Sequence, residues 1–307
     1  MRIFDSIRKT EYSTVVALGF FDGVHIGHKQ VINTCINNCD ENSKSVVFTF
    51  KESPHNTLSK TKKPLLTNNE QKFEHIEKLG VDEIFCVDFE SVMDLSADEF
   101  VRDILRDKLN AQCVVTGFNY RFSKGGKADA DELAKLCSKY NIRTIKCEPV
   151  VFKGESVSST RIRQCIANGD IQAANAMLGY DFVIDTHVRS GNHIGTKINS
   201  PTINQRLHTD VVVPKLGVYA TMVTVKGKTY IGATNIGTHP TVGQCEPVCE
   251  THLLSYDGAD IYGESVQTKL VCFVRAEQKF DSIDELVAQI EKDTKTIEGF
   301  FKNKSTV

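Results

Sequence analysis

The chain has 307 residues, 40% of them hydrophobic, and a formal net charge of −2 at pH 7. This length is sufficient for two domains that each bury a core of their own. The near balance of charge excludes a general attractive field for polyanions, so we expect no nucleic-acid partner and a small anionic ligand instead.

No apolar run approaches the length of about 18 residues that a membrane span needs, so we expect no membrane association. The chain has ten cysteines, and its first residues are charged and form no apolar targeting segment. These features favour a reducing, cytoplasmic location. Cys35 with Cys39, and Cys245 with Cys249, are each separated by three residues, and neither pair has a second pair nearby. We therefore expect small core residues and no zinc site.

Strands and helices alternate through the first half of the chain. Short apolar and β-branched runs predict strands at residues 14–18, 45–50, 83–87, 112–116 and 142–147, and helical spacing predicts helices at 70–79, 97–109 and 130–140. This alternation is typical of an α/β domain with a parallel sheet, whose ligand lies at the carboxyl ends of the strands. No GxGxxG sequence is present, so a dinucleotide-binding Rossmann fingerprint is not supported.

The sequence GFFDGVHIGH, residues 19–28, joins the first of these strands to a helix. Its glycines let the backbone approach a ligand closely, and the free N–H groups at the start of the helix favour an anion. His25 and His28 can then face one phosphate and stabilise the charge that builds on its oxygens during nucleotidyl transfer. A single histidine near a helix start is more often a cap or a surface group. Two histidines with HxGH spacing after a strand favour the phosphate site.

The same ten residues resemble the first motif of the bacterial bifunctional riboflavin kinase/FMN adenylyltransferase family, also called FAD synthetases. The resemblance extends along nearly the whole chain. It implies a Rossmann-like nucleotidyltransferase domain with a parallel sheet over residues 1–181 and a riboflavin kinase domain over residues 182–307. It also implies that His25 and His28 are catalytic, and that this motif binds ATP phosphates through Gly19, Phe21, Asp22 and Gly23.

Residues 50–55, FKESPH, are similar to the F-x-P-H motif of the family but about two residues longer. A loop with a solvated His55 is an equal interpretation of this segment. The longer spacing therefore leaves His55 without an assigned role.

Residues 117–122, GFNYRF, resemble the flavin-binding G-x-D-F-R-F motif of the family. The resemblance implies that Asn119, Arg121 and Phe122 bind the flavin, through aromatic faces and a guanidinium that suits its phosphate tail. Asn119, Tyr120 and Ser123 replace the usual Asp, Phe and Gly. We therefore expect the contacts on the flavin side to be rearranged.

Residues 158–163, SSTRIR, directly precede a predicted helix. Hydroxyl groups, arginines and a helix N-terminus together form a receptor for the β and γ phosphates of ATP. In isolation, a Ser N-cap followed by solvated arginines explains the segment equally well. Its match to the family implies that Ser159, Thr160 and Arg161 bind the leaving pyrophosphate, and Arg163 is left unassigned.

After Gly179 the pattern changes to short strands separated by turn residues. Strands are predicted at residues 211–213, 217–225, 229–233 and 269–274, and closing them into an antiparallel barrel would remove their exposed edges. A helical tail is predicted to follow, with an apolar face made by Ile283, Leu286, Ile290, Ile297, Phe300 and Phe301.

Motifs of this second half follow the order of the riboflavin kinase domain in the family: NSPTIN at 199–204, PKLGVYA at 214–220, NIGTHPT at 235–241 and ETHLL at 250–254. The resemblance implies that Thr202 and Asn204 coordinate Mg²⁺ with the ATP phosphates, and that Glu250 is the general base for the 5′-hydroxyl of riboflavin. It further implies that Gly195 binds ATP and that Arg275 binds the flavin. Without the resemblance, Thr202 and Asn204 are turn residues after a proline, and Glu250 is a solvated strand residue.

These expectations describe an enzyme of flavin cofactor biosynthesis, with ATP as co-substrate and Mg²⁺ as cofactor. Riboflavin is phosphorylated to FMN, and AMP is then transferred from ATP to FMN, giving FAD and pyrophosphate. We expect riboflavin, FMN, FAD and ATP as partners and a monomer or weak homo-oligomer. The alternatives are a single-activity member, with one domain silenced by the substitutions at Asn119, Ser123, Asn199 or Ser200, and a non-catalytic flavin-binding protein. A cytidylyltransferase that shares HxGH would leave the second half unexplained.

Overall fold

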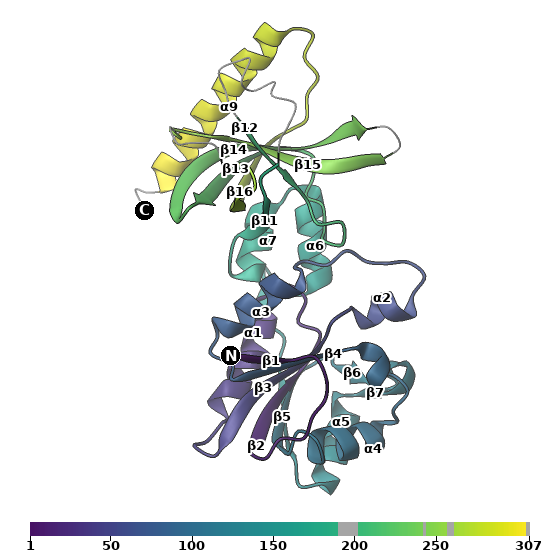
Figure 1. The fold of residues 1–307 in the computed structure, drawn as a ribbon. Coiled ribbons are helices and arrows are strands. Elements are labelled where there is room, and N and C mark those ends of the chain that lie inside the picture. Colours follow the sequence, from purple (N-terminus) through teal and green to yellow (C-terminus); the bar gives the residue numbers. More distant parts are fainter. Residues whose placement is uncertain (190–201, 242–243, 257–260, 305–307) are drawn as a thin grey trace. The chain divides into compact units, whose positions relative to one another are not determined.

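The structure is a computed structural model that describes residues 1–189, 202–241, 244–256 and 261–304 (Figure 1). The chain divides into two compact units, Met1–Ser159 and Thr160–Val307. The two helices that follow Ser158 therefore belong mostly to the second unit, and the domain boundary at residues 181/182 stays a prediction.

A parallel sheet forms the centre of the first unit. Its strands lie in the order β1-β4-β3-β2-β5-β8, and every neighbouring pair is parallel. The five predicted strands are all present, as β2 (Ser13–Leu18), β3 (Ser43–Phe50), β4 (Glu83–Val87), β5 (Ala111–Gly117) and β8 (Arg143–Cys147), and β1 (Arg2–Phe4) adds an edge. The chain order reverses between β2 and β5, and in open α/β sheets ligands bind outside the carboxyl ends of the strands at such a switch point.

Helices cover both faces of this sheet, which explains why its central strands are mostly apolar and buried. Val15 and Ala17 pack with α1 (Ile26–Asn37) and α3 (Asn69–Glu77), whereas Val16 and Leu18 face the opposite side. That side is covered by α4 (Ala97–Glu99), its π-helical continuation η2 (Phe100–Arg106) and α5 (Ala130–Lys139). The helices predicted at 70–79 and 130–140 are confirmed. The predicted helix at 97–109 contains a π-helical turn, in which the N–H of Asp107 donates to the carbonyl of Arg102.

Short elements connect these layers: α2 (Pro54–Leu58), η1 (Phe89–Ser91), η3 (Lys124–Gly126) and two small hairpins formed by β6 (Arg121–Phe122) with β7 (Ala128–Asp129) and by β9 (Val151–Phe152) with β10 (Glu155–Ser156).

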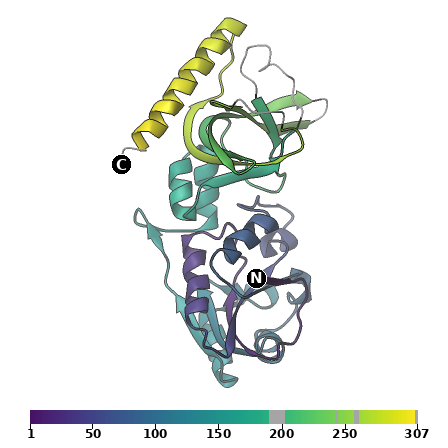
Figure 2. The same cartoon turned by 60° about the vertical axis from the view of Figure 1, so that its left-hand side comes forward.

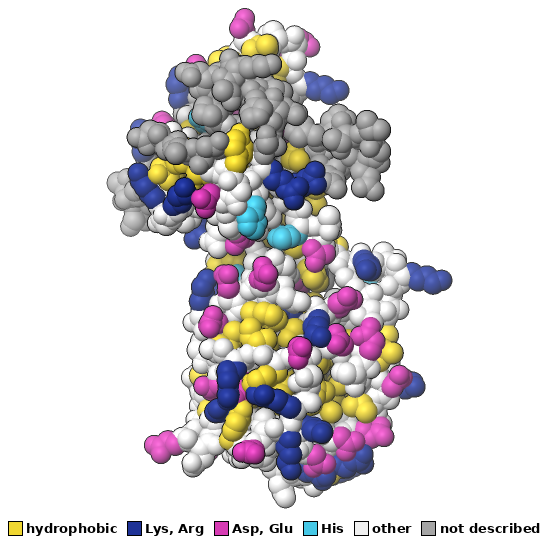
Figure 3. All heavy atoms as spheres, viewed as in Figure 1, with side chains coloured by type: hydrophobic (Ala, Val, Ile, Leu, Met, Phe, Trp, Pro, Cys, Tyr) yellow, Lys and Arg dark blue, Asp and Glu magenta, His cyan; other side chains and the backbone are white. Residues whose placement is uncertain are grey.

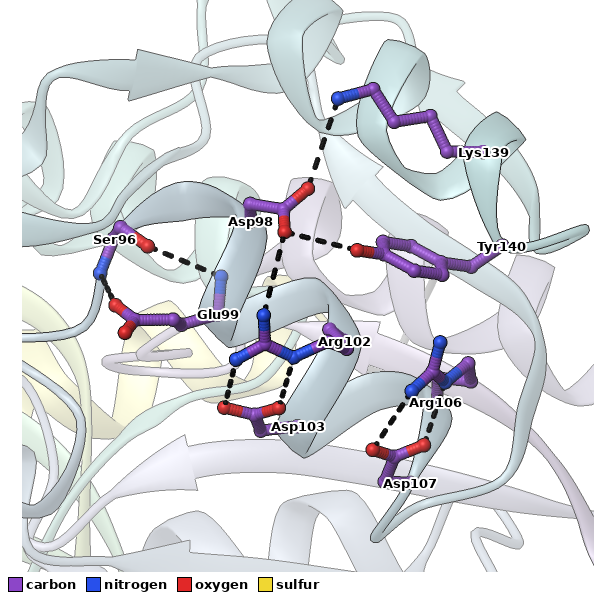
Figure 4. A network of polar contacts seen from close by, with 9 residues as sticks. All are labelled: Ser96, Asp98, Glu99, Arg102, Asp103, Arg106, Asp107, Lys139 and Tyr140. Carbon is purple, nitrogen blue, oxygen red and sulfur yellow. Dashed lines mark hydrogen bonds and ion pairs between the residues drawn. The ribbon is translucent and has the colours of Figure 1, made fainter.

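A network of exposed polar contacts ties α4 and η2 to the end of α5 (Figure 4). The Asp98 carboxylate accepts a hydrogen bond from the Tyr140 hydroxyl at 2.9 Å and pairs with Arg102 and Lys139, each at 3.8 Å. Arg102 and Arg106 each also make a two-point contact with the aspartate that follows them. Such exposed pairs contribute little to stability individually, so the buried apolar layer beneath them holds these helices in place.

The second unit begins with α6 (Ser159–Asn168) and α7 (Ile171–Leu178) and continues as an antiparallel sheet. The strands lie in the order β11-β16-β13-β14-β15-β12. The sheet curls (Figure 2) until its outer strands approach each other, and the backbone N–H of Arg189 donates to the Asn204 carbonyl at 2.8 Å. This closure confirms the predicted barrel. The strands are β11 (Phe182–His187), β12 (Thr202–Arg206), β13 (Gly217–Val225), β14 (Lys228–Thr241), β15 (Gln244–Leu253) and β16 (Ser265–Ala276).

The structure corrects several expectations for this half. The strand predicted at residues 211–213 is wrong: the segment is a loop in which only Val212 is buried, and Pro214 beyond it cannot donate to a ladder. β14 and β16 extend beyond their predicted ends, and β11, β12 and β15 were not predicted. Their outward residues are polar, so the apolar run that signals a strand is interrupted.

The predicted helical tail is α9 (Ile283–Lys304). Ile297, which is fully buried, packs with Phe300 and Phe301 against Val218 and Ala220 of β13. Ile283 was assigned to this apolar face but is 67% exposed, because the first turn of α9 extends beyond the hydrophobic cluster.

Acidic and basic side chains are interspersed over the part of the surface that Figure 3 shows. Of the described cysteines, six are buried and three half-buried, and all nine are free thiols. Among the described residues, no helix is both long and apolar enough to cross a membrane.

Candidate active sites in the two units

A cavity of about 400 Å³ opens at the carboxyl ends of β2 and β5 in the first unit. Gly19 and His28 of the residue 19–28 turn line it together with Asn119, Arg121 and Phe122. The segment predicted to bind phosphate and the segment predicted to bind flavin therefore share one pocket, although about 90 residues separate them in the sequence. This is the position at which an open α/β sheet binds its ligand.

The turn itself is held by buried polar groups and by unusual backbone angles. Phe21, Gly23 and Val24 have φ values of 56°, 77° and 36°. The buried Asp22 carboxylate accepts a hydrogen bond from the Leu66 N–H at 2.8 Å, and the Gly23 N–H donates to the Thr67 hydroxyl at 3.3 Å. The Asp22 carboxylate thus contributes to the shape of the turn.

The space around the first glycine of this turn is filled by its neighbour. A Cβ at Gly19 would lie 2.8 Å from the nearest ring atom of Phe21. Any larger residue at Gly19 would displace the aromatic ring that stands beside His28.

The two histidines form a stacked pair at the start of α1. His25 is the N-cap, and its Nδ1 accepts a hydrogen bond from the His28 backbone N–H at 3.2 Å. The two ring centroids lie 3.5 Å apart with the planes 16° from parallel, and the Phe21 ring meets the His28 ring edge to face at 5.4 Å. Burial, with the charges of His25 and Lys72, holds the pKa of His28 well below its usual range. His28 Nδ1 is buried and has no hydrogen-bond partner among the described residues.

Of the SSTRIR residues, Ser159 reaches the turn directly. Its hydroxyl donates to the Asp22 carbonyl at 3.0 Å. Thr160 and Arg161 follow on α6 and belong to the second unit, so their part in phosphate binding stays a prediction.

The flavin segment contributes two aromatic residues to the pocket: Phe122, which was predicted to bind the flavin, and Tyr120, which replaces the Phe of the family motif. Phe122 is buried and lies nearly parallel to Tyr120, with their ring centroids 5.9 Å apart. Burial raises the pKa of Tyr120, so its hydroxyl stays protonated. Arg121 and Asn119 are exposed at the pocket mouth, and the Arg121 guanidinium donates to the Gly126 carbonyl at 3.5 Å.

Sequence reasoning missed most of the apolar wall of this pocket. The wall includes Phe50, Leu58, Phe89, Val92, Met93 and Phe100. Phe50 ends β3, Phe100 begins η2, and the others lie in the short segments that follow β3 and β4, where an apolar residue near the end of a parallel strand was the only signal. His55 is exposed on α2 and is not part of the pocket wall, so the structure gives it no role.

The second unit assembles its candidate residues by strand register. Asn204 of β12 lies directly opposite Glu250 of β15, and Glu250 lies opposite Asn235 of β14. Directly opposed residues point to the same face of a sheet, so the three side chains form one row. Thr202 lies two residues before Asn204 and shares that face. The adjacent residues Gln205, Cys249 and Ile236 are buried on the inner face.

Hydroxyl, carboxamide and carboxylate oxygens are the donors that a hard cation such as Mg²⁺ prefers, so the donor set at Thr202, Asn204 and Glu250 fits this ion. Asn235 was not predicted individually, although it belongs to the NIGTHPT segment. Gly237 follows on the same face, and a Cβ there would clash with the Glu277 carboxylate. Gly195, Asn199 and Ser200 lie outside the described residues.

Arg275 has a different set of contacts from those expected of a flavin ligand. Its guanidinium binds the buried Asp293 carboxylate of α9, with Nε at 2.9 Å and Nη2 at 2.8 Å from Oδ2. Gln289 also donates to Asp293, at 2.8 Å. These contacts join the helical tail to β16, and the flavin role of Arg275 stays a prediction.

Comparison with known proteins assigns each unit to a family. A family model described as FAD synthetase matches residues 7–161, and one described as riboflavin kinase matches residues 178–301. Curated relatives named bifunctional riboflavin kinase/FMN adenylyltransferase include one from Listeria monocytogenes, 35% identical over 95% of this chain and 94% of the relative, and one from Bacillus subtilis, 34% identical over 97% and 95%. A third, from Escherichia coli K12, is 34% identical over 94% and 92%.

A solved structure has the same fold over its whole length. It is described as a macrolide-efflux protein from Streptococcus pneumoniae, has a TM-score of 0.89 and 29% sequence identity, and the match covers 97% of this chain and 99% of that one.

Proposed function

Because the chain belongs to the bifunctional riboflavin kinase/FMN adenylyltransferase family, we propose that its two candidate sites catalyse two successive steps of FAD synthesis. The second unit phosphorylates riboflavin with ATP to give FMN. The first unit transfers AMP from a second ATP to the FMN phosphate, giving FAD and pyrophosphate.

The stacked histidine pair in the wall of the aromatic pocket is the observation that supports adenylyl transfer most strongly. An FMN phosphate oxygen attacks the α-phosphorus of ATP in line, and charge grows on the oxygens around phosphorus. His28, held neutral by its surroundings, donates a hydrogen bond to that charge, and His25 fixes the helix start beside it. Ser159, Thr160 and Arg161 bind the pyrophosphate as it leaves. The apolar wall and Phe122 hold the isoalloxazine ring, and Asn119 and Arg121 bind at its polar edge.

Phosphorylation of riboflavin relies on the row across β12, β15 and β14. Glu250 removes the proton from the 5′-hydroxyl of riboflavin, this oxygen attacks the γ-phosphorus of ATP, and ADP leaves as the bond from the γ-phosphorus to the bridging oxygen breaks. Asn204 and Asn235 flank Glu250 in the register and orient it. Thr202 and Asn204 would hold Mg²⁺. When bound, this ion would neutralise negative charge on the ATP phosphates. Gly195 contributes to ATP binding, and Arg275 supports the flavin end by fixing α9 against β16.

We further propose that the protein acts in the cytoplasm as a monomer or weak homo-oligomer, with riboflavin, FMN, FAD and ATP as its partners. These partners are small molecules, and the described part of the surface in Figure 3, on which charges of both signs are interspersed, shows no extended patch of one sign for a polyanion.

Chromatography of flavin products tests the proposal. Purified protein is incubated with ATP and Mg²⁺ and either riboflavin or FMN. FAD from both reactions supports both activities. FMN as the end product from riboflavin, with supplied FMN unchanged, would mean that the first site is silent, and FAD only from supplied FMN would mean that the second is silent. No product in either reaction would favour a flavin-binding protein.

A further inference from the structure

A buried lysine lies behind the histidine turn, and no step proposed above uses it. Lys72 of α3 is only 2% exposed, which makes it one of the largest fully buried side chains in the described structure. Transferring an ammonium group out of water costs several kcal/mol or more unless other groups compensate it. An apolar residue at this position of α3 would complete the core at no such cost, so the charge itself requires an explanation.

Two contacts of Lys72 lead to the pocket. Its Nζ donates to the Phe50 carbonyl at 3.0 Å, at the carboxyl end of β3, and lies 4.7 Å from the centre of the Phe20 ring. Phe20 and Phe50 both line the cavity that contains His28. A cation near an aromatic ring is attracted by the ring's negative face, and more strongly where water is excluded.

Burial lowers the pKa of Lys72, and Cys86 and the buried Asp22 carboxylate of the turn oppose this shift and favour the charged form. The ammonium therefore has a carbonyl, an aromatic ring and an opposite charge to compensate its loss of water.

We propose that Lys72 is a positioning residue for adenylyl transfer: its ammonium fixes Phe20 and Phe50 in the pocket wall and supplies a positive charge beside the histidine pair. This inference rests on the proposed function of the first site. Lys72 acts through its neighbours, and nothing in its contacts requires it to touch the substrate.

Burial and His25 lower the pKa of His28, and the charge of Lys72 adds to this effect. Two imidazoles stacked at 3.5 Å repel each other if both are protonated, and Lys72 adds a third positive charge. The groups that act on His28 are His25 from the turn and Lys72 from α3, both of which lower its pKa together with burial. A second proton on His28 would occupy Nδ1, where no described acceptor meets it. His28 therefore remains neutral and donates through Nε2.

The test uses the full-length protein with Lys72→Met, which removes the charge at similar volume, and Lys72→Arg, which keeps it. Lys78→Met is the matched control, because Lys78 lies at the end of the same helix with a side chain 70% exposed. Three quantities are measured for each: kcat and KM for FAD formation from FMN between pH 5 and 8, the rate of riboflavin phosphorylation, and the titration of His28 by NMR.

In Lys72→Met, we expect kcat for FAD formation to fall at least tenfold (about 1.4 kcal/mol) with a smaller change in KM. Loss of a positive neighbour raises the pKa of His28, so its titration and the acid limb of the activity profile should both move to higher pH. Lys72→Arg should retain most of the rate and a low His28 pKa. Lys78→Met should match the wild type, and all variants should phosphorylate riboflavin normally.

A folded Lys72→Met protein with the wild-type profile and His28 titration would overturn the inference. If that variant fails to fold, the wild-type titration still decides: a His28 that is protonated at pH 7 would overturn it. Wild-type protein that makes no FAD from FMN would instead refute the proposed function of the first site.

Discussion

The two candidate sites are built in different ways. In the first unit, the residues stand on turns and loops that follow parallel strands, and the histidine pair depends on strained backbone angles within one turn. In the second unit, Asn204, Glu250 and Asn235 stand on regular strands, and only the antiparallel register brings them together. The comparison teaches that local backbone geometry fixes the side-chain positions of the first site, whereas the pairing of distant strands fixes those of the second.

The sharpest separation of the two sites is expected from Glu250→Gln. Loss of a general base typically costs a factor of about 10²–10⁴, so riboflavin phosphorylation should fall by that amount. FAD formation from supplied FMN should stay within about twofold of wild type. Glu264→Gln is the matched control, because Glu264 is an exposed glutamate of the same unit that pairs with Lys226. Comparable loss of both reactions in a folded Glu250→Gln protein would contradict two separate sites.

His28→Ala is the converse experiment on the first unit. Removing one preorganised donor from a developing charge costs a factor of about 10²–10³, so FAD formation from FMN should fall by that amount while riboflavin phosphorylation continues. His55→Ala serves as control, because His55 is exposed in the same unit and does not line the pocket. If His55→Ala lost as much FAD formation from FMN as His28→Ala, the stacked pair would have no special role.

The buried pair between Arg275 and Asp293 predicts a change in stability. Asp293→Asn leaves the Arg275 guanidinium without its carboxylate, and we expect the second unit to lose about 2 kcal/mol of unfolding free energy, less than for a fully buried pair because Arg275 reaches solvent. Urea unfolding of the full chain measures it. The exposed pair of Arg102 with Asp103 (Figure 4) is the comparison, and Asp103→Asn should leave stability unchanged. Equal effects of the two substitutions would remove the structural role assigned to Arg275.

Gly23→Ala tests the backbone of the first site. Gly23 has φ of 77°, and an alanine in this region costs about 1–2 kcal/mol. We expect a matching loss of stability in the first unit together with slower FAD formation. Gly80→Ala is a close control, because Gly80 has φ of 91° with no atom within 4 Å of an added Cβ, and it lies outside the pocket wall. Gly80→Ala should lose stability but keep its activity. Unchanged FAD formation in Gly23→Ala would show that the turn tolerates distortion.

The first unit was predictable because its signals are local. The strand from 14 to 18 and the turn with His25 and His28 are contiguous in sequence, so their order alone predicts a site at the end of a strand. Lys72 escaped notice because a lysine in a helix normally extends to solvent, and only the fold shows that its side chain is buried.

The second unit was less predictable because its site depends on the pairing of strands that are distant in the sequence. β12 and β15 place polar residues outward and pair across more than 40 residues of chain, so no local pattern identifies Asn204 as the neighbour of Glu250. The apolar run at 211–213 predicted a strand, yet it leads into Pro214 and forms none. Register is a property of the assembled sheet, and sequence spacing does not encode it directly.

The most direct test of two separate sites acting in succession is a mixture of Glu250→Gln and His28→Ala proteins supplied with riboflavin, ATP and Mg²⁺. Neither variant alone should convert riboflavin to FAD at an appreciable rate. The account predicts that the mixture makes FAD, because His28→Ala supplies FMN and Glu250→Gln adenylylates it. A mixture that yields no FAD, although each protein is folded, would contradict the division of the two reactions between the two units.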